Sequence, residues 1–299
     1  MTILIIGSKG FVGSYLTRSW RKASHTIFGC DVGVDYNDAQ YFQVDSTNAN
    51  YEEIFLSRKF EACVNCSGAA SVPDSLIHPL RDFALNTQNV FLMLEAIRKH
   101  NNSCKFINLS SAAVYGNPFS LPVKESAAVD PVSPYGNHKS YAEEICKEFS
   151  RFYGLQTCSV RIFSAYGPGL QKQLFWDLHQ RIKMHGKLEL MGTGNESRDF
   201  IFIQDIVDGL EVILRKGDFS AGVYNLASGR ETTIREAVQT FVDCFDESVP
   251  FSFSNEVRKG DPLNWRADIS KIQALGFTPG FSLQDGLKKY KEWLATEKR

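Results

Sequence analysis

The first half of the chain alternates short apolar runs with segments of helical periodicity. Six apolar runs predict strands: TILIIG (2–7), TIFGCD (26–31), YFQVD (41–45), ACVNCSG (62–68), KFINLSS (105–111) and CSVRIFSAYG (158–167). Four segments between them predict helices: residues 11–23, 51–57, 79–100 and 135–153. This alternation is typical of a parallel sheet with helices on both faces, so we predict an α/β fold with a doubly wound, Rossmann-type sheet.

The pattern changes after Pro168. The segments there are shorter and richer in Gly, Pro and Asp, which predicts a smaller α/β domain over residues 168–299 beside a larger one over residues 1–167. Individual segments can cross between the two. In open α/β sheets ligands bind at the carboxyl ends of the strands, so we expect the site between the two domains.

A glycine-rich loop, GSKGFVG (7–13), joins the first predicted strand to the first predicted helix. Gly7 permits the sharp turn out of the strand, Gly10 lets the backbone approach a pyrophosphate, and Gly13 allows the helix to pack closely on the sheet. The amino terminus of the helix, with Phe11 and Val12, offers N–H groups to phosphates. A purely structural glycine turn is the alternative, but the strand–loop–helix context favours a dinucleotide site.

Asp31 ends the second predicted strand and bears on the choice of cofactor. Its carboxylate can accept hydrogen bonds from the adenosine ribose and would repel a 2′-phosphate, which favours NAD over NADP. Lys9, inside the glycine loop, is either a solvated charge or a group that reaches such a phosphate. We therefore expect NAD, with NADP as the open alternative.

Composition and charge exclude several classes of protein. The chain has 299 residues, of which 43% are hydrophobic and 22% charged, as is usual for folded soluble proteins. The net charge of −1 supplies no global field for nucleic acid or an acidic membrane surface. The start has no basic leader, and no stretch approaches the roughly 20 apolar residues of a membrane span. We expect a cytoplasmic protein without nucleic-acid or membrane partners.

The seven cysteines are an odd number in mostly apolar contexts, which predicts reduced, packed thiols. CVNC (63–66) matches a redox or metal motif in form, but residues three apart on a strand point to opposite faces. Histidines show no paired-ligand spacing on a helix either. We therefore expect no metal site.

The segment SPYGNHK (133–139) places Tyr135 and Lys139 four residues apart, on one face of a predicted helix. A nearby ammonium stabilises a phenolate. Lowering the pKa of a phenol from near 10 to about 7 takes roughly 4 kcal/mol, which a lysine, a cationic nicotinamide and a dry cleft can supply together. The pair is either an exposed helical pair or a proton-transfer set.

Seven motifs together resemble the extended short-chain dehydrogenase/reductase family, and they look most like its nucleotide-sugar epimerase and dehydratase branch, which includes UDP-glucose 4-epimerases. The motifs are GSKGFVG, FINLSSAAVYG, SPYGNHK, RIFSAYGPG, RDFIFIQDIVDGL, VYNLASG and KGDPLNWRADISK. The resemblance covers essentially the whole chain. It implies an NAD-binding domain over 1–167 and a nucleotide-sugar-binding domain over 168–299.

The resemblance also implies a catalytic set of Ser111, Tyr135 and Lys139. Tyr135 would take the proton from a sugar hydroxyl while NAD accepts hydride from the same carbon. Lys139 would also hold the nicotinamide ribose, and Ser111 would hydrogen-bond the same sugar oxygen.

Further cofactor positions carry over from the resemblance. It implies Asp45 near the adenine, Ser67, Gly68 and Ala69 along the cofactor after the fourth predicted strand, and Asn86 as a supporting helix residue.

Substrate positions carry over in the same way. The resemblance implies Arg198 and Arg258 at the diphosphate, where a planar cation suits phosphate oxygens, Asp261 and Trp265 beside the nucleotide ribose, and Ser164 in the sugar pocket. For either arginine alone, a surface salt bridge is the default interpretation.

Two departures from the family pattern bear on the reaction. Ala112 and Ala113 stand where dehydratases of this branch usually carry an acid, which disfavours a 4,6-dehydratase. Ser164 stands where many relatives have Asn, which leaves the identity of the sugar open.

Three functions follow from these positions. The first is an NAD-dependent epimerase acting at C4 through a transient 4-keto sugar. The second is a 4-ketoreductase that consumes NADH or NADPH, for which Lys9 is the hint, and the third is a non-catalytic dinucleotide-binding regulator. The resemblance further implies surface-polysaccharide precursor synthesis and a homodimer formed through residues 79–100 and 135–153. The apolar residues Tyr141, Ile145 and Phe149 recur at helical spacing and either form this interface or cover the sheet.

Overall fold

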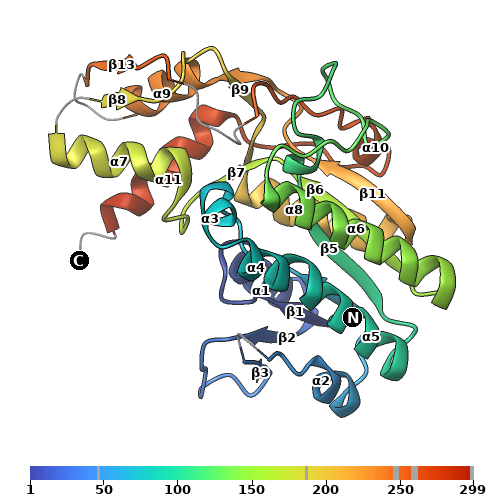
Figure 1. Cartoon of the computed structure of the whole chain (residues 1–299). Coiled ribbons are helices and arrows are strands. Elements are labelled where there is room, and N and C mark those ends of the chain that lie inside the picture. The colour runs from blue at the N-terminus through green and yellow to red at the C-terminus, as the bar shows by residue number, and fades with distance from the viewer. Residues whose placement is uncertain (46–47, 186–187, 245–248, 257–261, 297–299) are drawn as a thin grey trace.

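A seven-stranded parallel sheet forms the centre of the protein in the computed structural model, which describes residues 1–45, 48–185, 188–244, 249–256 and 262–296 (Figure 1). The strand order is β11–β6–β5–β4–β1–β2–β3, and every neighbouring pair is parallel. The strands are β1 Thr2–Ile6, β2 Thr26–Asp31, β3 Tyr41–Gln43, β4 Ala62–Asn65, β5 Lys105–Ser111, β6 Thr157–Ile162 and β11 Ser220–Leu226. The order reverses between β1 and β4, so the predicted doubly wound sheet is confirmed.

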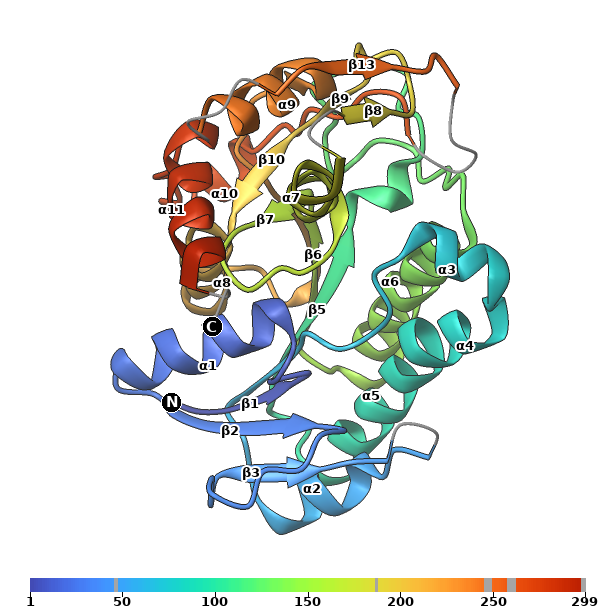
Figure 2. The same cartoon turned by 90° about the vertical axis from the view of Figure 1, so that its left-hand side faces the viewer.

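Helices cover both faces of this sheet (Figure 2). One face carries α2 Tyr51–Ser57, α5 Asn89–His100 and α6 Pro134–Tyr153, and the other carries α1 Phe11–Lys22 and α8 Ile203–Lys216. Side chains alternate along a strand, so β1 supplies Ile3 and Ile5 to one core and Leu4 and Ile6 to the other. Buried strands of this kind have apolar residues at nearly every position, as the sequence indicates.

The cysteines of CVNC follow the same alternation. Cys63 lies in the core beneath α2 and α5, whereas Cys66 packs against the core on the opposite face. Both thiols are free, as the odd number of cysteines and the strand geometry predict.

Two predicted elements are divided in the structure. The run 158–167 forms β6 and then β7 Ser164–Tyr166, which leaves the main sheet to pair with β10 Phe200–Phe202. The predicted helix 79–100 consists of α4 Pro79–Phe83, a π-helical turn η1 Ala84–Gln88, and α5. A short helix, α3 Val72–Ile77, precedes it, capped by Ser71, whose hydroxyl accepts a hydrogen bond from the Asp74 N–H.

The second half of the chain builds a smaller region beside the carboxyl ends of β5 and β6 (Figures 1 and 2). It contains three two-stranded sheets, β7–β10, β9–β12 and β8–β13. The other strands among the described residues are β8 Leu188–Leu190, β9 Ser197–Arg198, β12 Thr232–Thr233 and β13 Phe251–Phe253. The other helices are η2 Ala112–Tyr115, which follows β5, and α7 Gln173–His185, α9 Ile234–Asp243, α10 Ser270–Gln273 and α11 Leu283–Thr296 in the second half. Because β11 and α8 return to the main sheet, the chain crosses between the two regions, and the boundary at residues 167 and 168 stays a prediction.

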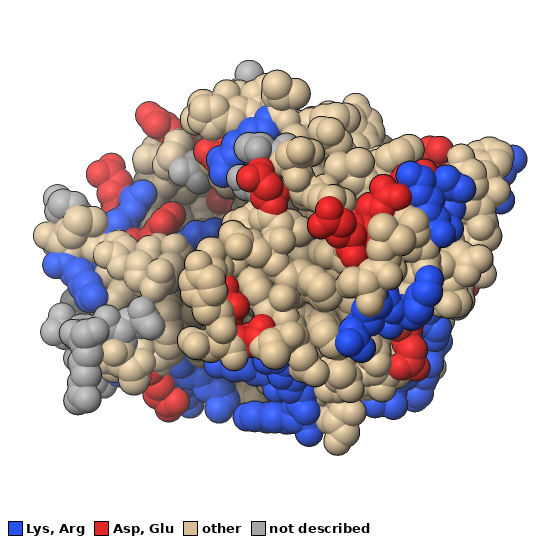
Figure 3. All heavy atoms as spheres, turned by 90° about the horizontal axis from the view of Figure 1, so that it is seen from below, with Lys and Arg blue, Asp and Glu red and all other residues tan. Residues whose placement is uncertain are grey.

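The surface carries both signs of charge. Figure 3 views the molecule from below, where Lys and Arg gather along the lower margin of the face and uncharged residues occupy much of its centre. Within the described ranges, none of the helices combines the length and apolar character required to cross a membrane.

Candidate active site

The glycine loop has the turn predicted for Gly7 and the close packing predicted for Gly13. Gly7 has φ +80°, a conformation in which other residues are strained, and a Cβ on it would lie 2.7 Å from the Ser67 backbone nitrogen. A Cβ on Gly13 would lie 2.1 Å from the Gly7 carbonyl oxygen, so only glycine lets α1 approach β1 this closely. Helix α1 begins at Phe11, and its N-cap, Gly10, supplies no side-chain cap. The first-turn N–H groups, including that of Val12, therefore suit a pyrophosphate.

Asp31 lies at the carboxyl end of β2 and helps to hold the glycine loop. Its carboxylate accepts hydrogen bonds from the backbone N–H groups of Lys9 and Val32, each at 2.8 Å. An ionised carboxylate has about four acceptor positions, so two of them remain for ribose hydroxyls. The Lys9 ammonium pairs with Asp35 rather than with Asp31. Lys9, for which the sequence left open a solvated charge or a partner for a 2′-phosphate, thus forms an ion pair with Asp35 at the surface.

The carboxyl end of β4 forms the next part of the site. Asn65 accepts hydrogen bonds from the Ser67 N–H and hydroxyl, at 3.1 and 2.6 Å. Gly68 has φ +117°, and a Cβ there would lie 2.4 Å from Asn86 Oδ1 and 3.4 Å from Lys139 Nζ. The loop that continues to Ala69 is thus brought next to the predicted catalytic lysine.

Asp45 lies farther out, beyond the end of β3. It is exposed, and its carboxylate accepts a hydrogen bond of 3.0 Å from the Asn48 N–H. It follows the edge strand of the sheet, so its predicted place near an adenine stays a prediction.

Ser111, Tyr135 and Lys139 are brought together where β5 ends and α6 begins. Ser111 is the last residue of β5, and its hydroxyl lies near the Tyr135 phenol and acts to lower the pKa of that phenol. Ser133 caps α6 by accepting a hydrogen bond from the Gly136 N–H at 3.2 Å, with Pro134 in the first turn. A buried lysine follows Tyr135 by one turn, so the two lie on one face of the helix.

Burial sets the protonation of both side chains. It raises the pKa of Tyr135 above its ordinary value, the nearby Ser111 hydroxyl acts to lower it, and the Asp82 carboxylate raises it further. Burial lowers the pKa of Lys139 to about 8, while Asp82, Cys66 and Glu143 act in the opposite direction. The prediction that a dry cleft helps to lower the pKa of the phenol is wrong, because burial favours the neutral phenol and raises its pKa. The Lys139 ammonium donates to the Leu109 carbonyl at 3.0 Å. The other expected contribution is the positive charge of a nicotinamide.

Asn86 lies in the π-helical turn η1 and is 1% exposed. Its side-chain oxygen and nitrogen are buried and have no hydrogen-bond partner among the described residues. Buried amides normally have partners, so an unsatisfied one beside Gly68 and Lys139 fits a polar ligand at this place. The residues present thus fit a dinucleotide at both its pyrophosphate and its nicotinamide end.

A buried ion pair beneath α6 is a feature that the sequence reasoning missed. Glu143, one turn beyond Lys139, accepts hydrogen bonds from Arg161 Nε at 2.9 Å, from Arg161 Nη2 at 2.6 Å and from the Ser110 hydroxyl at 2.6 Å. The side chains of Arg161 and Glu143 are 3% and 2% exposed. An arginine within the apolar run of β6 was the signal available in the sequence, since such a charge needs a buried partner.

Two of the predicted substrate residues, Arg198 and Trp265, lie together. The Arg198 guanidinium is 5.4 Å from the centre of the Trp265 ring, and Trp265 Nε1 donates to the Gly116 carbonyl at 3.0 Å. Ser164 begins β7 and is half-buried. Arg258 and Asp261 lie outside the described residues.

Asp199 holds these segments in place and was also missed from the sequence. Its fully buried carboxylate accepts hydrogen bonds from the Ser228 N–H at 2.8 Å, the Gly229 N–H at 3.0 Å and the Ala267 N–H at 3.1 Å. These bonds join the strand of Arg198 to the segment that carries Trp265.

Ala112 and Ala113 form the start of η2, directly after Ser111, and both are buried. No carboxyl group therefore stands at the position from which related dehydratases supply an acid. The prediction against a 4,6-dehydratase rests on these two residues and stays a prediction.

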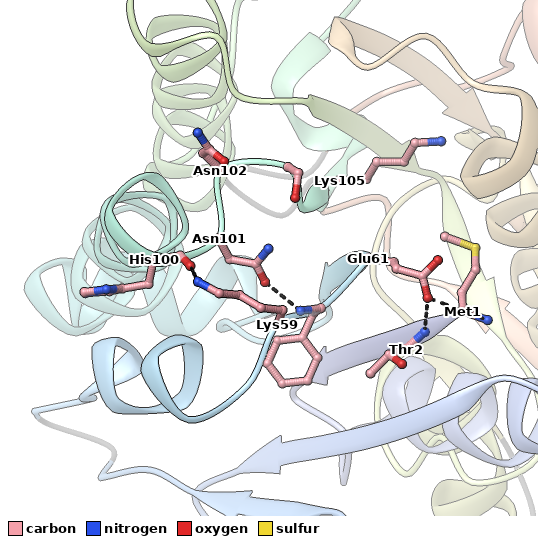
Figure 4. Close-up of a pocket in the computed structure, with 10 residues that line it drawn as sticks. Met1, Thr2, Lys59, Glu61, His100, Asn101, Asn102 and Lys105 are labelled. Atoms are coloured by element: carbon pink, nitrogen blue, oxygen red, sulfur yellow. Dashed lines mark hydrogen bonds and ion pairs between the residues drawn. The ribbon is translucent and has the colours of Figure 1, made fainter.

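A separate hollow lies at the opposite edge of the main sheet (Figure 4). It has a volume of about 650 Å³ and lies between the start of β1, the segment before β4 and the end of α5. Its polar groups largely bond one another: the Lys59 ammonium donates to the His100 carbonyl, the Phe60 N–H to Asn101, and the Thr2 N–H to Glu61. The hollow is remote from the carboxyl edge and adds nothing to the predicted site.

The doubly wound sheet and its glycine loop define an α/β protein of the dinucleotide-binding class. Comparison with known families goes further. The chain belongs to the NAD dependent epimerase/dehydratase family, whose model matches residues 3–227. This confirms the resemblance that its motifs suggest.

The relatives and solved structures agree with this assignment. A putative UDP-glucose 4-epimerase of Methanocaldococcus jannaschii is 25% identical, with 99% of each chain covered. An uncharacterized UDP-glucose epimerase of Bacillus subtilis is 29% identical over 96% of each chain. The solved structure of a UDP-glucuronic acid 4-epimerase from Bacillus cereus, in complex with UDP-glucuronic acid and NAD, has a TM-score of 0.90 at 24% identity and covers 99% of this chain and 100% of its own.

Proposed function

We propose that the protein is an NAD-dependent nucleotide-sugar epimerase that inverts C4 of a UDP-linked sugar through a transient 4-keto sugar. The observation that carries the proposal is the cluster of Ser111, Tyr135 and Lys139 beside a glycine loop, without a carboxyl group in the following turn. That arrangement suits removal and return of a proton and a hydride at one carbon. It lacks the acid that elimination of water requires.

The protein's residues have separate roles in this reaction. Bound NAD supplies a hydride acceptor and then a hydride donor at the reacting carbon. Tyr135 takes the proton from the C4 hydroxyl and later returns it, and the Ser111 hydroxyl orients the same oxygen. The Lys139 ammonium holds the nicotinamide ribose and, once a cofactor is bound, favours the phenolate by its charge.

The remaining residues bind the two ligands. Gly7, Gly10 and Gly13 with the first turn of α1 hold the pyrophosphate of NAD, and Asp31 accepts hydrogen bonds from the adenosine ribose. Arg198 binds the diphosphate of the sugar nucleotide next to Trp265. Arg258 and Asp261 extend this role in the proposal by analogy with the family.

The names of the relatives support UDP-linked sugars as the substrate class. They include glucose, glucuronic acid and N-acetylglucosamine derivatives. The ketoreductase alternative depended on Lys9 as a partner for a 2′-phosphate, and the ion pair of Lys9 with Asp35 weakens that hint. We propose a cytoplasmic role in making precursors of surface polysaccharides.

We also propose a homodimer formed through α4, α5 and α6. Exposed apolar side chains lie along these helices: Leu80 is 80% exposed, Phe91 43%, Tyr141 48% and Phe152 67%. Large apolar side chains grouped on neighbouring helices are typical of an interface. Of the two alternatives for Phe149 and Ile145, covering the sheet is the one that fits, because Phe149 is buried in the core beneath α6 and Ile145 packs against it.

The direct test has two parts. The purified protein is denatured and its extract analysed for NAD, which an epimerase is expected to retain. UDP-glucose, UDP-glucuronic acid and UDP-N-acetylglucosamine are then supplied separately, without added cofactor, and the C4 epimer is measured by NMR. A protein that is empty and that only oxidises added NADH or NADPH with a keto sugar would be a reductase instead.

Tyr135→Phe is the matched variant for this test. It removes only the phenolic oxygen, so the fold and the retained cofactor should persist while turnover falls at least about 100-fold. Thermal unfolding and the NAD content of the variant serve as controls. An unchanged rate would remove Tyr135 from the mechanism.

A further inference from the structure

A second buried pair of titratable side chains lies between α4 and α6. Asp82 in α4 is 3% exposed, and one of its carboxylate oxygens lies 2.6 Å from His138 Nδ1 in α6. The His138 side chain is 12% exposed. The other Asp82 oxygen is buried and accepts no hydrogen bond from the part of the chain that the structure describes. A buried carboxylate with one free oxygen exerts its charge on whatever groups surround it, because little water screens it.

The position of this pair ties it to the predicted proton-transfer set. His138 directly precedes Lys139 and lies within the turn that begins at Tyr135. Its carbonyl oxygen accepts a hydrogen bond of 2.9 Å from the Thr87 hydroxyl of η1, next to Asn86. The segment 82–88 is therefore fastened to α6 at the level of the catalytic pair.

The Tyr135 backbone is fastened from the same side. Its N–H donates to the Ser75 hydroxyl of α3 at 3.1 Å, so α3, α4 and η1 together hold the first turns of α6. The residues that face His138 are the carboxylate of Asp82 and the rings of Phe83 and Tyr141, whose centres lie 5.5 and 6.1 Å from the imidazole.

Charge connects the two pairs. The Asp82 carboxylate raises the pKa of both Tyr135 and Lys139, acting with burial on the phenol and against it on the ammonium. The other groups near Lys139 are Cys66, a buried thiol, and Glu143, which is bonded to Arg161. Among the residues that the structure describes, Asp82 is the carboxylate that acts on both Tyr135 and Lys139.

We propose that Asp82 is a positioning residue that His138 holds in place. The negative charge of the Asp82 carboxylate keeps Lys139 protonated and sets the pH at which Tyr135 becomes a base. The consequence for catalysis rests on the proposed function, whereas the effect on Tyr135 itself does not. Asp82 lies outside the motifs by which the sequence resembles its family, whereas His138 lies within SPYGNHK (133–139).

The test compares Asp82→Asn with His138→Gln. Asp82→Asn is nearly isosteric and removes the charge, so Tyr135 and Lys139 should both lose their protons at lower pH, by about one pH unit. His138→Gln keeps the carboxylate and removes the imidazole, so it should not lower either midpoint. Thermal unfolding checks that each variant is folded.

Tyr135 is titrated directly through tyrosinate absorbance. The titration of the Tyr135→Phe protein is subtracted from that of its parent, and the same subtraction is made in the Asp82→Asn background. The pH profile of C4 epimerisation is measured in parallel, and both of its limbs should move to lower pH in Asp82→Asn. If the parent protein proves to have no epimerase activity, the absorbance titration still reports the effect of Asp82 on Tyr135.

Two results would overturn the proposal. One is an unchanged Tyr135 midpoint in a folded Asp82→Asn protein. The other is a lowered midpoint in His138→Gln, which would show that loosening of α6 rather than charge moves the titration. The second result remains decisive even if Asp82→Asn does not fold.

Discussion

Asp31→Ala should reverse part of the preference for NAD over NADP. In the structure this carboxylate accepts the N–H groups of Lys9 and Val32 and keeps acceptor positions for a ribose. The variant would remove that ribose hydrogen bond, worth about 1 kcal/mol. It would also remove the repulsion of a phosphate carrying about −1.5 to −2 charges, worth about 1–2 kcal/mol at a partly exposed site.

The two effects act in the same direction on the ratio of the dissociation constants. Together they amount to about 2–3 kcal/mol, or roughly 30- to 150-fold in favour of NADP. The backbone N–H groups of Lys9 and Val32 would lose the carboxylate that accepts their hydrogen bonds. This should lower the free energy of unfolding only slightly, because Lys9 is exposed and water can replace the carboxylate. The assay is fluorescence titration of cofactor-stripped protein with NADH and NADPH.

Asp35→Ala provides the matched control for the role of Lys9. Lys9 pairs with Asp35 in the structure, so this variant frees the ammonium while leaving Asp31 in place. It should improve NADPH binding modestly and leave NADH binding nearly unchanged, and the double variant should combine both gains. A parent protein that prefers NADPH, or an Asp31→Ala protein with an unchanged ratio, would show that Asp31 does not meet the ribose.

The remaining predictions concern protonation, stability and assembly. Burial lowers the pKa of Lys139 to about 8, so kcat/KM, which needs the ammonium, should fall as the pH rises through that value; a profile that stays flat to pH values near 10 would contradict this, since an ordinary lysine titrates there. Glu143→Gln leaves the Arg161 guanidinium buried without its anion and should lower the free energy of unfolding by about 3–5 kcal/mol in urea titrations; a cost below about 1 kcal/mol would mean that water relieves the charge. Phe152→Glu, at a 67% exposed position of α6, should yield monomers in light scattering; an intact dimer, or a monomeric parent, would refute the proposed interface.

The main features of the fold could be predicted because local rules determine them. A parallel sheet buried on both faces requires strands that are apolar at nearly every position, and the runs at residues 2–7 and 105–111 satisfy this. The glycine loop could be predicted equally well, because the backbone at Gly7 and Gly13 leaves no room for a side chain and therefore requires glycine. The clustering of Ser111 with Tyr135 follows from a strand end and a helix start at one edge of the sheet.

Features that depend on distant partners could not be predicted in this way. Nothing local marks residue 163 as the place where the chain leaves the main sheet, since β7 does so to pair with β10. The Asp199 carboxylate accepts hydrogen bonds from Ser228 and Ala267, which lie 29 and 68 residues further along the chain. The break in the helix 79–100 is likewise a π-helical turn with no proline or glycine within it. For β7 and Asp199 a long-range contact decides, and periodicity contains no information about it.

The exposed apolar face and the Asp82–His138 pair share side chains. Phe83 and Tyr141 contact the His138 ring and are themselves 37% and 48% exposed. A second copy packed over these helices would exclude water from the imidazole and strengthen the field of the carboxylate, because electrostatic interactions grow as the local dielectric falls. Assembly and the protonation of Tyr135 would then be linked through one buried carboxylate. In that case the protonation of Tyr135 and Lys139 would differ between the monomer and the dimer.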